Sequence, residues 1–124
     1  MEDIQKKCIL VVDDKRENLT LLSAIFKKYG HKYITAESGE ESINLMNKHK
    51  DIVLILMDIK MMGIDGTDAM KIIKKKYNIP IIAVTGLASA SDRKNLMDQG
   101  FDDYISKPID IQYLLQKINS ILES

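Results

Sequence analysis

Short apolar runs alternate along the chain with longer segments in which apolar residues recur every three or four positions. The runs are bounded by turn residues, and most are rich in Val and Ile, which predicts strands. The five predicted strands are Cys8 to Val12, the weaker Lys32 to Ala36, Ile52 to Met57, Pro80 to Thr85 and the short Asp103 to Ile105. The third run contains no polar residue, which is typical of a strand covered by helices on both faces.

The segments between the runs have the periodicity of amphipathic helices. The first predicted helix carries apolar residues at Leu19, Leu22, Phe26 and Tyr29 and ends at Gly30. The second begins at Ser38, which forms a capping box with Glu41 three residues later. The third is capped by either Asp65 or Thr67, and its apolar stripe comprises Ala69, Met70, Ile72, Ile73 and Tyr77.

The last two helices differ in their apolar content. The fourth has two competing caps, Ser89 and Ser91, and few large apolar residues besides Leu96 and Met97, so we expect it to be weakly docked and mobile. The fifth begins at Asp110 and has a wide stripe of Ile111, Leu114, Leu115, Ile118, Ile121 and Leu122. Core packing is the favoured explanation of that stripe, and a partner surface is the alternative. Strands that alternate with helices predict an α/β fold with a mainly parallel sheet.

Length and charge exclude several classes of protein. The 124 residues fit one domain, residues 1–124, and the 18 basic residues balance the 18 acidic ones. Without a basic excess, neither nucleic acid nor an anionic membrane is an expected partner. Cys8 is the single cysteine, so an internal disulfide is impossible and a buried, reduced thiol is expected. We find neither a signal peptide nor a membrane span, which makes the cytoplasm the expected compartment.

Polar residues follow four of the predicted strands. They are Asp13-Asp14, Asp58, Thr85-Gly86 and Ser106-Lys107. A parallel sheet places all four strand ends at one edge, where α/β proteins bind ligands. Each feature alone has a simpler explanation: an acidic pair caps the next helix, a threonine stabilises a turn, and a lysine is a solvated charge.

Three carboxylates at one edge would repel one another and raise each other's pKa values, so a cation is expected among them. The candidates are the ammonium of Lys107 and a divalent metal. Oxygen ligands without nearby His or Cys favour a hard ion, Mg²⁺ where phosphate is handled. A carboxylate beside a metal, an ammonium and a hydroxyl is suited to attack phosphorus and become an aspartyl phosphate.

Five motifs in this order resemble the receiver domain of two-component response regulators over nearly the whole chain. They are Ile9-Leu10-Val11-Val12-Asp13-Asp14, Leu56-Met57-Asp58-Ile59-Lys60-Met61, Asp65-Gly66, Ala83-Val84-Thr85-Gly86 and Gly100-Phe101-Asp102-Asp103-Tyr104-Ile105-Ser106-Lys107-Pro108. The resemblance implies a doubly wound, flavodoxin-like fold with five parallel strands in the order 2-1-3-4-5 and five flanking helices. It also implies that the surface of the fourth helix, fifth strand and last helix reports phosphorylation to a partner, which raises the weight of the partner explanation for the last helix.

By the same resemblance, Asp58 is the phosphoacceptor. Asp58 is also part of the implied Mg²⁺ site, in which Asp14 binds the metal directly, Asp13 binds it through water, and the backbone carbonyl of Lys60 completes the protein's ligands.

Three further roles come from the family. Thr85 bonds the phosphoryl group and shifts on activation, and Lys107 pairs with that group. Tyr104 is the aromatic switch, and the peptide bond before Pro108 is expected to be cis.

The leading functional hypothesis is a signalling switch, not a metabolic enzyme, that accepts phosphate from a histidine kinase or a histidine phosphotransfer protein. The chain also resembles receivers attached to hybrid histidine kinases, and a phosphorylation-dependent homodimer through the reporting surface is a further expectation. One alternative is a Mg²⁺-dependent phosphatase with an aspartyl nucleophile, although such enzymes carry an acid where this chain has Lys60. A second alternative is a degenerate receiver that acts by binding alone. A third is a nucleotide or flavin carrier, although this chain has no glycine-rich phosphate-binding loop.

Overall fold

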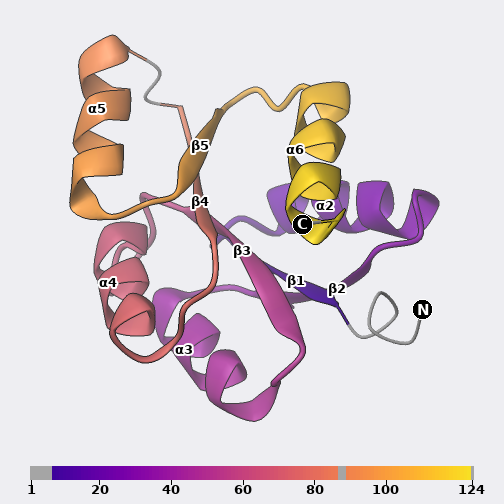
Figure 1. The fold of residues 1–124 in the computed structure, drawn as a ribbon, viewed down its shortest axis with the longest axis horizontal. Helices are drawn as coiled ribbons and strands as arrows, with labels where there is room; N and C mark the ends of the chain where they lie inside the picture. Colours follow the sequence, from indigo (N-terminus) through magenta and orange to yellow (C-terminus); the bar gives the residue numbers. More distant parts are fainter. Residues whose placement is uncertain (1–6, 87–88, 124) are drawn as a thin grey trace.

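The predicted strands pair side by side in one parallel sheet in the computed structural model, which describes residues 7–86 and 89–123. The strands are β1 (Cys8–Val12), β2 (Lys32–Ala36), β3 (Ile52–Asp58), β4 (Ile81–Thr85) and β5 (Asp103–Ser106). The helices are α2 (Arg16–Lys28), α3 (Gly39–Lys48), α4 (Gly66–Lys76), α5 (Ala90–Gln99) and α6 (Ile111–Glu123). The sheet order β2-β1-β3-β4-β5 confirms the doubly wound α/β prediction (Figure 1).

Helices cover both faces of the sheet, as the apolar runs require. In β1, Ile9 and Val11 pack with the apolar side chains of α2 and α6, whereas Leu10 and Val12 pack with those of α3, α4 and α5. Figure 1 shows these two helical layers on opposite sides of the strands. Every residue of β1 and β4 is buried, which explains why their sequences show no polar alternation.

Four residues of the predicted apolar stripes are exposed instead of buried. They are Tyr29, Ile72, Met97 and Ile111, each at least 40% exposed. Tyr29 lies beyond the last turn of α2, and the other three lie at helix positions that face away from the sheet. The expected thin docking of α5 is confirmed, because Leu96 is the one buried residue within Ala90–Gln99.

The helix caps were predicted in part. Ser38 accepts a hydrogen bond from the Glu41 N–H at 3.0 Å, but the Glu41 carboxylate accepts from Glu37 N–H instead of closing the box on Ser38. Between the competing candidates, Asp65 caps α4 and Ser89 caps α5. Ser89 forms a complete capping box with Asp92, so an acidic residue near the start of α5 compensates for its few apolar contacts.

Two expectations from the sequence concern a signal peptide and a membrane span. Residues 1–6, where a signal peptide was sought, lie outside the described residues. Within the described ranges, none of the helices combines the length and apolarity needed to cross a membrane.

Cys8 is buried, and burial raises the pKa of its thiol to about 11, so the thiol is protonated and inert at neutral pH.

Candidate functional site

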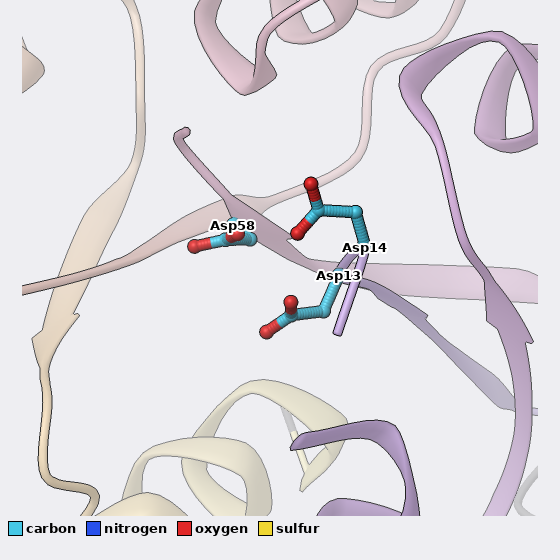
Figure 2. Close-up of side chains that lie close together, drawn as sticks. All are labelled: Asp13, Asp14 and Asp58. Carbon is cyan, nitrogen blue, oxygen red and sulfur yellow. The ribbon is translucent and has the colours of Figure 1, made fainter. Parts of the chain in front are cut away.

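Two neighbouring strands bring three carboxylates to one edge of the sheet. Asp13 and Asp14 directly follow β1, and Asp58 is the last residue of β3, which pairs with β1. One oxygen from each residue lies within 4.8 Å of the others, and Figure 2 shows the three side chains gathered at the strand ends. Asp13 is 3% exposed and Asp58 is 7% exposed. We call these three residues the acidic cluster.

Lys107 is the cation that pairs with the acidic cluster in the part of the chain that the structure describes. Its Nζ lies 3.0 Å from Asp58 Oδ1 and 3.6 Å from Asp13 Oδ2. The Lys107 backbone N–H donates to the Thr85 carbonyl at 2.8 Å, which holds the lysine beside the end of β4. The peptide bond between Lys107 and Pro108 is cis.

The electrostatics of Asp58 are unfavourable for its charged form. Burial raises its pKa, and the nearby charges of Asp13 and Asp14 raise it further, while the hydrogen bond from Lys107 lowers it. Among the described residues, Lys107 is the one ammonium that forms ion pairs in the acidic cluster, with two of its three carboxylates. A second cation bound here would relieve the repulsion that raises the pKa of Asp58.

Asp14 has one carboxylate oxygen that a bound cation would satisfy. Its Oδ2 accepts a hydrogen bond from the Met62 N–H at 3.2 Å, whereas its Oδ1 is buried and has no hydrogen-bond partner among the described residues. A buried carboxylate oxygen without a partner is costly, and a metal ion would satisfy it. The acidic cluster offers oxygen ligands only, which suits a hard ion such as Mg²⁺.

A pocket of about 210 Å³ opens onto Asp58. The residues that line it are Lys15, Asp58, Lys60, Thr85, Gly86 and Lys107. Thr85 ends β4 and is 4% exposed, so its position is fixed by the sheet. A Cβ atom at Gly86 would meet no atom of a residue beyond its chain neighbours within 4 Å, which leaves open space next to the threonine. The pocket combines a carboxylate, a hydroxyl and ammonium groups around one small volume.

Asn18, to which the sequence pattern assigns no role, contacts the acidic cluster. Its side-chain amide donates to Asp13 Oδ2 at 3.0 Å, and the backbone N–H of Lys15 donates to Asp13 Oδ1 at 2.9 Å. Asn18 lies in the first turn of α2, five residues after Asp13. A polar amide in that turn, directly after an acidic pair, was the available sequence signal.

Tyr104 lies on β5, outside the residues that line the pocket. It is half-buried, and the guanidinium of Arg93 in α5 lies 5.0 Å from the centre of its ring. Arg93 also donates a hydrogen bond to the Tyr104 hydroxyl. The ring is therefore held against α5 in this structure.

The chain is similar to known proteins over most of its length. The family model described as the response regulator receiver domain matches residues 9–119. Protein PilH of Pseudomonas aeruginosa is 37% identical over 117 residues, covering 92% of this chain and 96% of PilH. The chain spans about half the length of several other curated relatives.

Solved structures are similar over the same range. The receiver domain of the Francisella response regulator 1452 aligns with a TM-score of 0.88 and 28% identity, covering 94% of this chain and 97% of that one. A chain of the CheX-CheY-BeF3-Mg+2 complex from Borrelia burgdorferi aligns with a TM-score of 0.83 and 30% identity, covering 93% of this chain and 88% of that one.

Proposed function

The chain belongs to the response regulator receiver domain family, and from this premise we propose that Asp58 accepts a phosphoryl group from a phosphohistidine. The donor is a histidine kinase or a histidine phosphotransfer protein. The observation that carries the proposal is the position of Asp58: it is a nearly buried carboxylate at a strand end, it bonds to Lys107, and it opens into a small cation-lined pocket.

The transfer exchanges one bond to phosphorus for another. An oxygen of Asp58 forms the new P–O bond while the P–N bond to the donor histidine breaks, and its electron pair stays on the imidazole nitrogen. Lys107 and the Thr85 hydroxyl bind the oxygens of the transferred group, whose charge grows in the transition state. Gly86 adds no side chain to the space beside Thr85, which leaves room for the group.

Magnesium fits the same set of residues. Asp14 and Asp58 would bind it directly, Asp13 through water, and the backbone carbonyl of Lys60 would complete the protein's ligands. When bound by these residues, Mg²⁺ would neutralise charge on the phosphoryl oxygens. The unpartnered Asp14 Oδ1 and the raised pKa of Asp58 support this assignment, and so does the Mg²⁺ named as a component of the similar Borrelia complex.

Phosphorylation is proposed to act as a signal, not as a step in metabolism. Thr85 would shift toward the phosphoryl group, and Tyr104 would follow as the aromatic switch. The surface of α5, β5 and α6 would then change its affinity for a partner or for a second copy of the chain. We propose a cytoplasmic module that binds neither nucleic acid nor membrane directly, consistent with its formal net charge of zero.

The decisive experiment is intact mass spectrometry after incubation with acetyl phosphate and Mg²⁺. The wild type is expected to gain one phosphoryl group, and Asp58→Asn and a metal-free sample are expected to gain none. Asp51→Asn is the matched control, because this aspartate precedes the same strand at its other end and should leave the adduct intact.

The other outcomes identify the alternatives. Release of free phosphate over many turnovers without an adduct would favour an aspartyl phosphatase. The absence of both adduct and turnover would favour a degenerate receiver that acts by binding alone.

A further inference from the structure

The side chain of Asn18 restrains one member of the acidic cluster. Its amide donates to Asp13 Oδ2 at 3.0 Å, and Asn18 is half-buried in the first turn of α2. The other oxygen of Asp13 is held by the Lys15 backbone N–H at 2.9 Å. Both oxygens of Asp13 are thus oriented by uncharged donors.

The oxygen that Asn18 holds also faces a competing donor. Lys107 Nζ lies 3.6 Å from Asp13 Oδ2, too far for a hydrogen bond but within reach of a small rotation of the carboxylate. A charge-assisted hydrogen bond between the two would be stronger than the bond from a neutral amide. Asp13 would therefore turn toward Lys107 if nothing opposed that movement.

We propose that Asn18 is a positioning residue that keeps Asp13 directed at the metal site and limits its contact with Lys107 to the 3.6 Å ion pair. The inference rests on the proposed function, because the metal it concerns is the Mg²⁺ of that site. Without the amide, the Asp13–Lys107 ion pair shortens to a hydrogen bond. The metal then has to break that hydrogen bond before Asp13 can take part in binding it.

The chemical type of Asn18 supports this role. A lysine or arginine at the position would also hold Asp13, but it would add a positive charge to a cluster whose negative excess attracts the metal. An aspartate would repel Asp13 instead of bonding to it. A neutral amide donor orients the carboxylate and leaves the net charge of the cluster unchanged, as the donors that hold ligand side chains do in metal sites.

Isothermal titration calorimetry with Mg²⁺ alone tests the inference on the unphosphorylated protein. Asn18→Leu keeps a similar volume without a donor, and we expect its Kd for Mg²⁺ to rise about 10-fold. Asn18→Gln retains an amide and is expected to recover part of the affinity. Asn44→Leu, at an exposed position of α3, is the matched control and should bind like the wild type.

Thermal unfolding without metal separates positioning from a purely structural role. A structural role would lower the Tm of Asn18→Leu and leave its Kd unchanged, which would overturn the inference. If Asn18→Leu does not fold, Asn18→Ala carries the same expectation. Equal Mg²⁺ affinity in wild type and variants would refute the role of Asn18 alone, whereas a wild type that binds no Mg²⁺ would refute the magnesium part of the proposed function as well.

Discussion

Strand β3 has an aspartate at each end, and the two residues have opposite electrostatic environments. Asp51 directly precedes the strand, and its carboxylate lies 2.5 Å from Lys32 Nζ. That hydrogen bond lowers the pKa of Asp51. Asp58 ends the strand, and burial beside two other carboxylates raises its pKa. The same residue type, one strand length apart, is stabilised in its charged form at one end and destabilised at the other.

The difference lies in how charges are matched. At the amino end, one carboxylate faces one ammonium, and both are partly exposed, with 24% and 52% of their side chains accessible. At the carboxyl end, the described residues provide one ion-paired ammonium, Lys107, for the three carboxylates of the acidic cluster. A carboxylate that already pairs with an ammonium gains little free energy from a bound cation. An unmatched cluster has unfavourable free energy that a bound cation or a transferred group can relieve, so the mismatch marks the functional end of the strand.

The largest expected effect concerns the backbone at the carboxyl end. A Cβ atom at Gly66 would lie 2.0 Å from the carbonyl oxygen of Asp58. Because that neighbour is backbone, Gly66→Ala must displace the end of β3 or the start of α4, and we expect a loss of about 3 kcal/mol in the free energy of unfolding. Urea denaturation measures the change.

Gly86→Ala is the matched control at the same edge of the sheet. Its Cβ would meet nothing within 4 Å, so the free energy of unfolding should change by less than about 0.5 kcal/mol. Equal losses in the two variants would show that the close approach of Gly66 to Asp58 does not determine the geometry of the site.

The second-largest expected effect is the change in stability when Mg²⁺ binds. Mg²⁺ at about ten times its Kd should stabilise the wild type by about 1.4 kcal/mol, since it binds the folded chain only. Asp14→Asn should lose most of this gain, because Asp14 carries the unpartnered oxygen. Asp51→Asn should keep the gain in full. Thermal unfolding with Mg²⁺ and with a chelator compares them, and a response lost in Asp51→Asn would refute the assignment of the metal to the carboxyl end.

The smallest expected effect appears without metal, where substitution of the two aspartates should change the stability of the fold in opposite directions. Asp58→Asn removes an unfavourable charge, while Lys107 still has Asp13 nearby, so we expect a gain of about 1 kcal/mol at pH 7. Asp51→Asn breaks a matched pair and should lower the Tm by about 2 °C.

The pH dependence of the two effects follows from the direction of each pKa shift. The raised pKa of Asp58 costs stability in full above the folded pKa, so the advantage of Asp58→Asn shrinks as the pH falls below that pKa and is gone below the unfolded pKa. The lowered pKa of Asp51 stabilises the wild type above the unfolded pKa, and that contribution is lost as the pH falls through the folded value. Thermal scans between pH 7 and pH 3 measure both, and two shifts of the same sign would contradict the comparison.

Sequence predicts the strands and their functional edge well, because both depend on local pattern. The apolar runs located all five strands, with bounds that differ by one residue in β3, β4 and β5. Parallel strands leave their carboxyl ends on one side, so the convergence of Asp13, Asp14 and Asp58 followed from the order of elements. The spacing of motifs then sufficed to place Lys107 near them.

The sequence did not predict which side chains would form hydrogen bonds or contacts with one another. Whether Asn18 or Lys107 bonds to a given oxygen of Asp13 depends on distances of a few tenths of an ångström between separate elements. The contact between Arg93 and Tyr104 joins a helix to a strand through two side chains that no periodicity relates. Exposure of Ile72 was missed because a residue at the margin of an apolar stripe faces the core or the solvent according to the helix's rotation.

The sparse attachment of α5 has a thermodynamic consequence. Within Ala90–Gln99, Leu96 is the one buried side chain, whereas α2 and α4 each bury four residues. Exposing the apolar surface that α5 buries costs about 2 kcal/mol, far less than the free energy of global unfolding. Its amide protons should exchange with solvent through a sub-global opening that leaves the sheet protected. A partner can therefore select a rearranged α5 from the native ensemble at a small cost in free energy.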